Sequence, residues 1–175
     1  YIVWEMDIFK IVIVFFSLIF LYSCSKETEN IKLIKETDQQ IEMISAYEKG
    51  MDLFEIGDYF AASKKFLEAE ILFPQSQWAP KSVLMASYSY YMQSYYSLAI
   101  ENIKRYLKTY PSDKNKAYAH YLLPIVYYET IEGEKKDLDP LLLSKKEFNF
   151  VIKNFPNTDY AYDAKFKIDL INDIL

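Results

Sequence analysis

A pattern of small, aromatic and proline residues recurs three times in this chain and constrains its fold more than any other feature. The fullest copy is AYEKGMDLFEIGDYFAASKKFLEAEILFP, residues 46–74, and partial copies end at Pro111 and Pro156. Pro111 follows Pro74 by 37 residues and precedes Pro156 by 45, so we expect an insertion in the third copy, at residues 132–140. A period of this length is typical of solenoids, in which each copy packs on its neighbours.

Each copy has the features of a hairpin of two helices. Small residues at Gly50 and Ala62 would let the two helices approach closely, and Phe66 would fill the space between neighbouring copies. A proline then ends the second helix, because it cannot continue the hydrogen-bond ladder. Only three glycines are present, which favours helices over many hairpin turns. We therefore predict an all-α solenoid with helices over 41–55, 58–72, 77–93, 96–109, 115–131, 140–154 and 158–174.

The pattern resembles the tetratricopeptide repeat, a helix–turn–helix unit of about 34 residues. The resemblance implies a superhelix in which the first helix of each hairpin lines the concave face. We expect about three and a half repeats over residues 41–175, with the array incomplete at its C-terminus. The first copy matches the characteristic positions of the repeat at Gly50, 57–59, Ala62, Phe66, Ala69 and Pro74.

The N-terminal part resembles a secretion signal. From Met6 the sequence is MDIFKIVIVFFSLIFLYSCSK, with Lys10 before an apolar run over 11–22. This run is shorter than the roughly twenty residues of a membrane-spanning helix and is typical of a signal peptide. The LYSC stretch at 21–24 resembles the lipobox of bacterial lipoproteins, which implies lipid chains, palmitate among them, on Cys24. A plain membrane anchor with an incidental cysteine stays open as the alternative.

We expect three segments along the chain. Residues 1–24 would be an N-terminal extension and lipoprotein signal peptide. Residues 25–40, SKETENIKLIKETDQQ, are polar and charged and are predicted to be a flexible tether. Residues 41–175 would be the repeat domain. In the lipoproteins that this chain resembles, a serine after the lipidated cysteine, as at Ser25, allows transfer to the outer membrane.

The whole arrangement resembles the BamD family, the lipoproteins of the outer-membrane β-barrel assembly (BAM) machinery. The resemblance rests on the lipobox, the short tether, the repeats and three further stretches: FPQSQWAPKS at 73–82, NKAYAHYLLPIVYYE at 115–129 and FPNTDYAYDAK at 155–165. It implies a non-catalytic scaffold, lipid-anchored in the outer membrane and facing the periplasm. Its implied partners are BamA, other assembly subunits and unfolded outer-membrane barrel proteins. Another periplasmic repeat lipoprotein, one that coordinates envelope or division machinery, remains the alternative.

Tyrosine is frequent, with 17 in the 175 residues, and several cluster in SYSYYMQSYYS at 87–97. The repeat register directs Tyr90 and Tyr127 into the core and other aromatic residues toward the groove. Tyrosine gives a large, rigid contact area, so we predict a peptide-binding surface. Aromatic residues at helical spacing also occur in cores, so that reading stays open. The predicted peptide-binding residues are Tyr47, Met51, Phe54, Leu84, Tyr88, Tyr91, Tyr118, Tyr121 and Tyr128, and the other inward positions hold Ile44, Lys81 and Ile125.

No sequence pattern indicates catalysis, a metal site or a cofactor. His120, the single histidine, has no second histidine or cysteine at metal-ligand spacing, so we expect a hydrogen-bonded structural histidine. There is no glycine-rich phosphate loop. The net charge is −5 and the lysines are interleaved with acidic residues, which does not indicate nucleic-acid binding. We therefore predict a protein that is not an enzyme.

Overall fold

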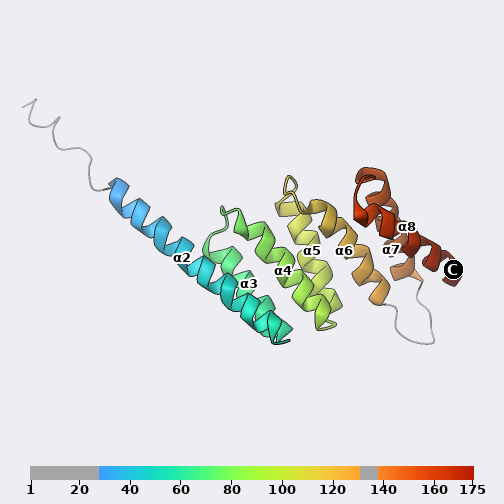
Figure 1. Cartoon of the computed structure of the whole chain (residues 1–175), viewed down its shortest axis with the longest axis horizontal. Coiled ribbons are helices and arrows are strands. Elements are labelled where there is room, and N and C mark those ends of the chain that lie inside the picture. Colours follow the sequence, from blue (N-terminus) through green and yellow to red (C-terminus); the bar gives the residue numbers. More distant parts are fainter. Residues whose placement is uncertain (1–27, 131–137) are drawn as a thin grey trace, which may run out of the picture. The chain divides into compact units, whose positions relative to one another are not determined.

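The structure is a computed structural model that describes residues 28–130 and 138–175, so Cys24 and the predicted signal peptide lie outside the described residues. Within those ranges the chain is entirely helical (Figure 1), which confirms the predicted all-α class. Residues Gln39–Leu175 form one compact unit. The helices are α2 (Thr28–Glu55), α3 (Tyr59–Leu72), α4 (Trp78–Met92), α5 (Tyr96–Thr109), α6 (Lys116–Glu129), α7 (Asp139–Asn154) and α8 (Asp159–Ile174).

The first helix is the one whose predicted bounds are wrong. It begins at Thr28 rather than at residue 41, so residues 28–40, which we expected to be a flexible tether, are helical. This stretch contains neither glycine nor proline and is rich in glutamate, lysine and glutamine, so nothing in it stops the helix. The other six helices begin and end within two residues of their predicted bounds.

Each helix from α3 onward packs on the next helix in the sequence, and α6 also contacts α8 (Figure 1). The core is accordingly divided into a series of clusters along the array. Phe66, Ile103 and Phe148 occupy the same position in the second helix of successive hairpins, and all three are buried. Contacts of this kind between neighbours are what hold a solenoid together.

Small residues set the spacing between helices in the first hairpin. A Cβ atom on Gly50 would lie 2.8 Å from ring carbons of Phe66, closer than side chains tolerate. Ala62, on the facing helix, is completely buried. The expectation that these positions need small side chains is therefore confirmed.

Two equivalent turns confirm the register of the repeat. Gly57 and Ser94 both have a positive φ, 82° and 60°, and they lie 37 residues apart. The amide after each turn residue donates to a carbonyl in the preceding helix: Asp58 N to Leu53 O and Tyr95 N to Tyr90 O, both at 2.9 Å. This is the hydrogen-bond pattern with which many helices end. Glycine adopts a positive φ without strain, and serine does not.

The third hairpin accommodates a proline within its first helix. Helix α6 continues through Pro124, which is completely buried. The carbonyl of Pro124 accepts a hydrogen bond from Ser144 Oγ of α7, at 2.8 Å. The expected insertion, at 132–140, precedes and enters the start of α7, and residues 132–137 of it lie outside the described ranges.

Candidate peptide-binding surface

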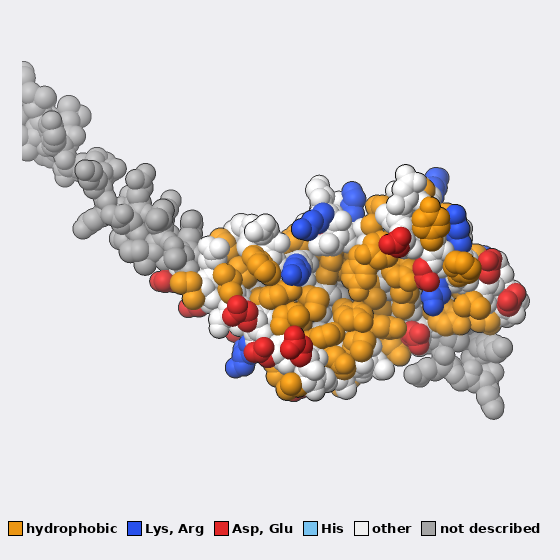
Figure 2. All heavy atoms as spheres, viewed as in Figure 1, with side chains coloured by type: hydrophobic (Ala, Val, Ile, Leu, Met, Phe, Trp, Pro, Cys, Tyr) orange, Lys and Arg blue, Asp and Glu red, His pale blue; other side chains and the backbone are white. Residues whose placement is uncertain are grey.

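The first helices of the hairpins place a group of aromatic residues on one face of the repeat unit. Figure 2 shows hydrophobic side chains, tyrosines included, running across the middle of this face, with both acidic and basic side chains around them. We call these residues the aromatic surface. Its members come from α2, α4, α6 and α8, and all of them are half-buried: Phe54, Tyr88, Tyr91, Tyr118 and Tyr160.

The rings of the aromatic surface form a row of two contacting groups. Phe54 stacks on Tyr88 with 5.7 Å between ring centroids, and Tyr88 lies 6.0 Å from Tyr91. Tyr118 lies 5.8 Å from Tyr160. Tyr88, Tyr91 and Tyr118 all pack against the same core cluster. Burial and then the phenols of Tyr88, Tyr160 and Tyr91 raise the pKa of Tyr118. Spacings of this size are favourable for aromatic pairs, so the row is a preorganised apolar surface.

The hydroxyl groups on this surface have no hydrogen-bond partner in the described part of the chain. This holds for Tyr88, Tyr91 and Tyr118. Buried phenol hydroxyls usually have a hydrogen-bond partner, so these hydroxyl groups are available to bond water or a bound peptide.

Two of the predicted peptide-binding residues are in the core instead. Tyr47 is 7% exposed and packs against Phe66 and Trp78, with centroid distances of 5.3 and 5.1 Å. Leu84 is 5% exposed. The expectation that they line an open surface is wrong, because Phe66 and Trp78 cover Tyr47 and Leu84 belongs to a core cluster.

The remaining predicted residues divide between surface and packing roles. Met51 and Tyr128 are half-buried. Met51 packs on the core cluster that contains Phe66, and Tyr128 packs on the cluster that contains Phe148. Tyr121 stacks on Tyr160 at 5.2 Å, and its hydroxyl donates to Asp163 of α8. It therefore joins α6 to α8 while keeping part of its ring exposed.

Sequence reasoning missed Trp78 and Tyr160. Both follow a proline at the start of a first helix, at the same position of the junction stretches at 73–82 and 155–165. That shared position is the signal that could have identified them. Trp78 packs over Tyr47, and Tyr160 extends the row of rings onto α8.

Lys81 lies on α4, the helix that carries Tyr88 and Tyr91, and its side chain is held over two aromatic rings. Its side chain is exposed, and its Nζ lies 4.9 Å from the ring centroid of Trp78 and 5.1 Å from that of Tyr47. It has no carboxylate partner in the described residues. A cation over two ring faces is stabilised there by the ring quadrupoles.

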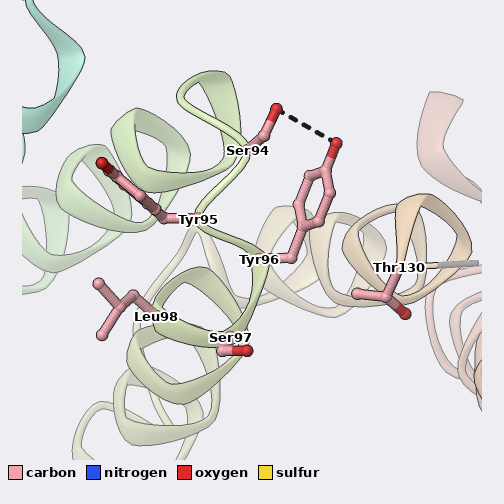
Figure 3. Close-up of a pocket in the computed structure, with 6 residues that line it drawn as sticks. All are labelled: Ser94, Tyr95, Tyr96, Ser97, Leu98 and Thr130. Carbon is pink, nitrogen blue, oxygen red and sulfur yellow. Dashed lines mark hydrogen bonds between the residues drawn. The ribbon is translucent and has the colours of Figure 1, made fainter. Parts of the chain in front are cut away.

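The two tyrosines that follow the turn at Ser94 point in different directions. Figure 3 shows Tyr95 and Tyr96 projecting to opposite sides of the chain, beside an open hollow of about 350 Å³. Tyr96 lies 6.3 Å from Tyr91 of the aromatic surface, whereas Tyr95 lies 5.5 Å from Phe60. The described residues that line the hollow include none with a charged side chain; they are Ser94, Tyr95, Tyr96, Ser97, Leu98 and Thr130.

A polar network joins α3 to α5. Arg105 makes two hydrogen bonds to Glu70, at 2.6 and 2.7 Å, and Tyr110 donates to the same carboxylate at 2.9 Å. Glu70 is buried, and a hollow of about 620 Å³ lies beside the pair. Because each charged group here has a partner, the network has the features of a structural tie.

His120 is structural, but one expectation about it is wrong. Its ring lies 4.5 Å from Phe150 and 5.7 Å from Phe155. Burial and then Lys116 lower the pKa of His120 below its ordinary value. We expected a hydrogen-bonded histidine, yet Nδ1 is buried without a partner among the described residues. The ring is held by aromatic packing instead.

In 28–130 and 138–175, no group of three His, Cys, Asp or Glu side chains is placed to hold a metal ion. In the same ranges, no helix combines the length and the apolar character needed to cross a bilayer.

Comparison with known proteins gives a consistent picture. The family model described as YfiO, outer membrane lipoprotein, matches residues 39–175. The outer membrane protein assembly factor BamD of Caulobacter vibrioides is 33% identical over 152 residues, which cover 87% of this chain and 49% of the relative. BamD of Rickettsia prowazekii is 34% identical over 129 residues, covering 74% of this chain and 51% of the relative. The chain therefore spans about half the length of these curated relatives.

A solved structure supports the fold. The C-terminal TPR-containing domain of a Plasmodium falciparum FK506-binding protein superimposes with a TM-score of 0.54 at 18% identity. The match covers 77% of this chain and 89% of the solved chain. At this identity the likeness concerns the tetratricopeptide architecture alone.

Proposed function

This chain belongs to the YfiO family of outer membrane lipoproteins, and from that premise we propose that it is a non-catalytic recognition and scaffold subunit for assembling outer-membrane β-barrel proteins. The relatives at 33% and 34% identity are named outer membrane protein assembly factors, which favours this function over coordination of envelope or division machinery. The observation that carries the proposal is the row of half-buried tyrosines whose hydroxyls make no hydrogen bond to any described residue.

The ligand that fits this surface is an extended, apolar segment of an unfolded barrel protein. Exposed ring faces can pack on alternate apolar side chains of such a segment, and the phenol hydroxyls can bond its backbone. Burying one aromatic side chain is worth roughly 1.5–3 kcal/mol. After the cost of ordering the peptide, a few such contacts give affinities on the order of micromolar. Weak binding suits a subunit that passes its client onward.

The partners and the location are part of the same proposal. BamA and other assembly subunits would bind the scaffold, which would face the periplasm from the outer membrane. Cys24 would carry the lipid anchor after removal of the signal peptide. Several acyl chains, at about 0.8 kcal/mol per buried CH₂, would hold the protein stably at the membrane. Expression of the Cys24→Ala variant in a Gram-negative host should give unprocessed protein without the mass of the acyl groups.

The central test removes two rings of the aromatic surface. Tyr88→Ala with Tyr91→Ala should weaken binding of a C-terminal peptide from an outer-membrane barrel protein by at least about tenfold, or roughly 1.4 kcal/mol. Thermal melting should show that the variant remains folded, because both side chains are half-buried. The matched control is Phe60→Ala with Tyr95→Ala, an aromatic pair away from this surface.

Two results would contradict the proposal. Loss of folding in the Tyr88→Ala, Tyr91→Ala variant would mean that these rings belong to the core. A folded variant with unchanged affinity would mean that clients bind elsewhere.

A further inference from the structure

The second helices of the first two hairpins form a groove on a different part of the protein from the aromatic surface. Near the starts of α3 and α5, the ring centroids of Phe60 and Tyr95 lie 5.5 Å apart. Near their ends, Arg105 makes hydrogen bonds to Glu70. The two helices therefore run side by side in the same direction. Phe60 and Glu70 are ten residues apart on α3, so this α3–α5 groove is about 15 Å long.

The α3–α5 groove is lined by apolar side chains, several of them exposed. Ile71 is 76% exposed and Leu98 is 37% exposed, and both line the hollow of about 620 Å³ that lies in the groove. Tyr90 of α4, which is itself buried, forms the base of this hollow. The Phe60 ring continues the apolar lining, because its centroid lies 6.5 Å from that of Tyr90. Single exposed apolar residues are ordinary, but a contiguous apolar patch is typical of an interaction site.

The hollow has one carboxylate without an ion-pair partner. Among the described residues that line it, the charged ones are Glu70, Glu101 and Arg105. Two hydrogen bonds join Arg105 to Glu70, so these two charges compensate each other. Glu101 is exposed and forms no ion pair with a described residue. The rim of the groove therefore attracts a cationic side chain.

The polar side chains of the groove are poorly suited to bind an extended backbone. Asn102 already donates to the carbonyl of Leu98 at 2.9 Å and accepts from Arg105 at 3.2 Å. An extended chain would need partners for its backbone amides and carbonyls, whereas a helix bonds its own. An apolar groove between two helices is accordingly suited to the apolar face of a third helix.

We propose that the α3–α5 groove binds an amphipathic helix of a partner protein, one whose apolar stripe is flanked by lysine or arginine. The stripe would pack on Ile71 and Leu98, and a flanking basic residue would pair with Glu101. About three turns of helix would fill the length of the groove. This interaction is separate from client binding and does not rest on the function proposed above.

The probe is a synthetic stapled helical peptide with leucines at i, i+3, i+4 and i+7 and lysines beside that stripe. A second peptide has glutamates in place of the lysines. Fluorescence anisotropy with the full chain at low salt should show the lysine peptide binding about threefold more tightly, which is within the range of an exposed ion pair. The difference should shrink at high salt, because salt screens exposed charges.

Two substitutions of exposed aliphatic residues test the apolar contact. Ile71→Gln should weaken binding of the lysine peptide by about tenfold, because the isoleucine side chain would be buried beneath the bound helix. The matched control is Leu170→Gln, since Leu170 is 52% exposed and lies on α8, which packs on α6 and α7. The control should bind the peptide as the native chain does. Thermal melting should show both variants folded.

A charge reversal tests the ionic contact. Glu101→Lys should reverse the preference, so that the glutamate peptide binds more tightly than the lysine peptide. An unchanged preference in this variant would overturn the pairing with Glu101, and equal binding of both peptides by the native chain would do the same.

The remaining outcomes separate this groove from the client surface. The Tyr88→Ala, Tyr91→Ala variant should bind the lysine peptide with native affinity, because those rings lie outside the groove. Loss of binding in that variant would mean that the peptide occupies the aromatic surface, which would contradict the inference. If neither peptide binds the native chain, or if Ile71→Gln binds normally, the α3–α5 groove is not a helix-binding site, and the proposed client function is unaffected.

Discussion

Two sets of tyrosines in this protein differ in what their hydroxyl groups do. In the structural set, Tyr106 donates to Asp113 at 2.5 Å and Tyr110 to Glu70 at 2.9 Å. Burial and the bond to Glu70 raise the pKa of Tyr110 to about 12. In the aromatic surface, the hydroxyls of Tyr88 and Tyr91 make no bond with the described residues. The hydroxyls of Tyr106 and Tyr110 are thus satisfied within the chain, whereas those of Tyr88 and Tyr91 remain available to a ligand.

A second contrast, in burial, occurs within a single helix. On α4, Tyr90 is 2% exposed, whereas Tyr88 and Tyr91 are half-buried. At 3.6 residues per turn, positions 88 and 90 are about 200° apart around the helix axis. Composition alone cannot distinguish them, and the repeat register can.

The largest expected effect tests this contrast directly. Tyr90→Ala should destabilise the protein by about 3–5 kcal/mol, because it removes a buried aromatic side chain and leaves a cavity. Tyr88→Ala should cost under about 1 kcal/mol, since a half-buried ring leaves a space open to water. Urea unfolding of the two variants gives both values. Equal losses would remove the distinction between core and surface tyrosines.

The next effect concerns the tie between α3 and α5. Glu70→Ala leaves Arg105 and Tyr110 without their shared acceptor and should cost about 2–3 kcal/mol, less than for a fully buried pair because Arg105 can turn to water. The control is Glu68→Ala, which breaks an exposed pair with Lys65 and should cost under about 1 kcal/mol. Comparable losses in the two variants would show that the network is not structural.

A smaller, stabilising effect is expected at the turn after α4. Ser94 has a φ of 60°, where Gly57 stands in the first repeat. Ser94→Gly should stabilise the protein by about 1 kcal/mol, because glycine relieves the left-handed strain that serine bears. The midpoint of urea unfolding should rise with an unchanged slope. A lower midpoint would mean that the flexibility added to the unfolded chain outweighs the strain relieved.

The smallest effect is a pH dependence from His120. Burial holds its pKa below the ordinary value when the chain is folded, so the unfolded chain binds the proton more readily. The stability that results is complete above about pH 6.5 and is lost as the pH falls through the range below it. Because this is the only histidine, His120→Phe should remove that loss between pH 7 and the range where carboxylates titrate. Melting temperatures that fall equally in both proteins over this range would exclude His120 as the cause.

The helices could be predicted because the sequence marks their ends. Proline follows each second helix, and Gly57 stands at a turn. Together with the small residues Gly50 and Ala62, these signals predicted helix bounds close to those observed. The start of α2 could not be predicted in this way, since residues 28–40 contain no stop signal and their polarity is compatible with both helix and tether.

The aromatic surface could be predicted only in part. The register identified Phe54, Tyr88, Tyr91 and Tyr118, but it does not state how closely successive repeats pack. Tyr47 is covered by Trp78 for that reason, although its position is equivalent to that of the half-buried Tyr121. Hydrogen bonds between helices far apart in sequence, such as Tyr121 to Asp163, also leave no local signal.

The most direct test of the central claim locates a bound client on the folded protein. A photoreactive benzoylphenylalanine would replace Tyr91 in one full-length variant and Tyr95 in another, and a C-terminal peptide from an outer-membrane barrel protein would be added to each. Tyr91 belongs to the aromatic surface, whereas Tyr95, four residues on, packs with Phe60 on another side. We expect strong crosslinking at position 91 and background crosslinking at position 95. Crosslinking at 95 with none at 91 would contradict the account.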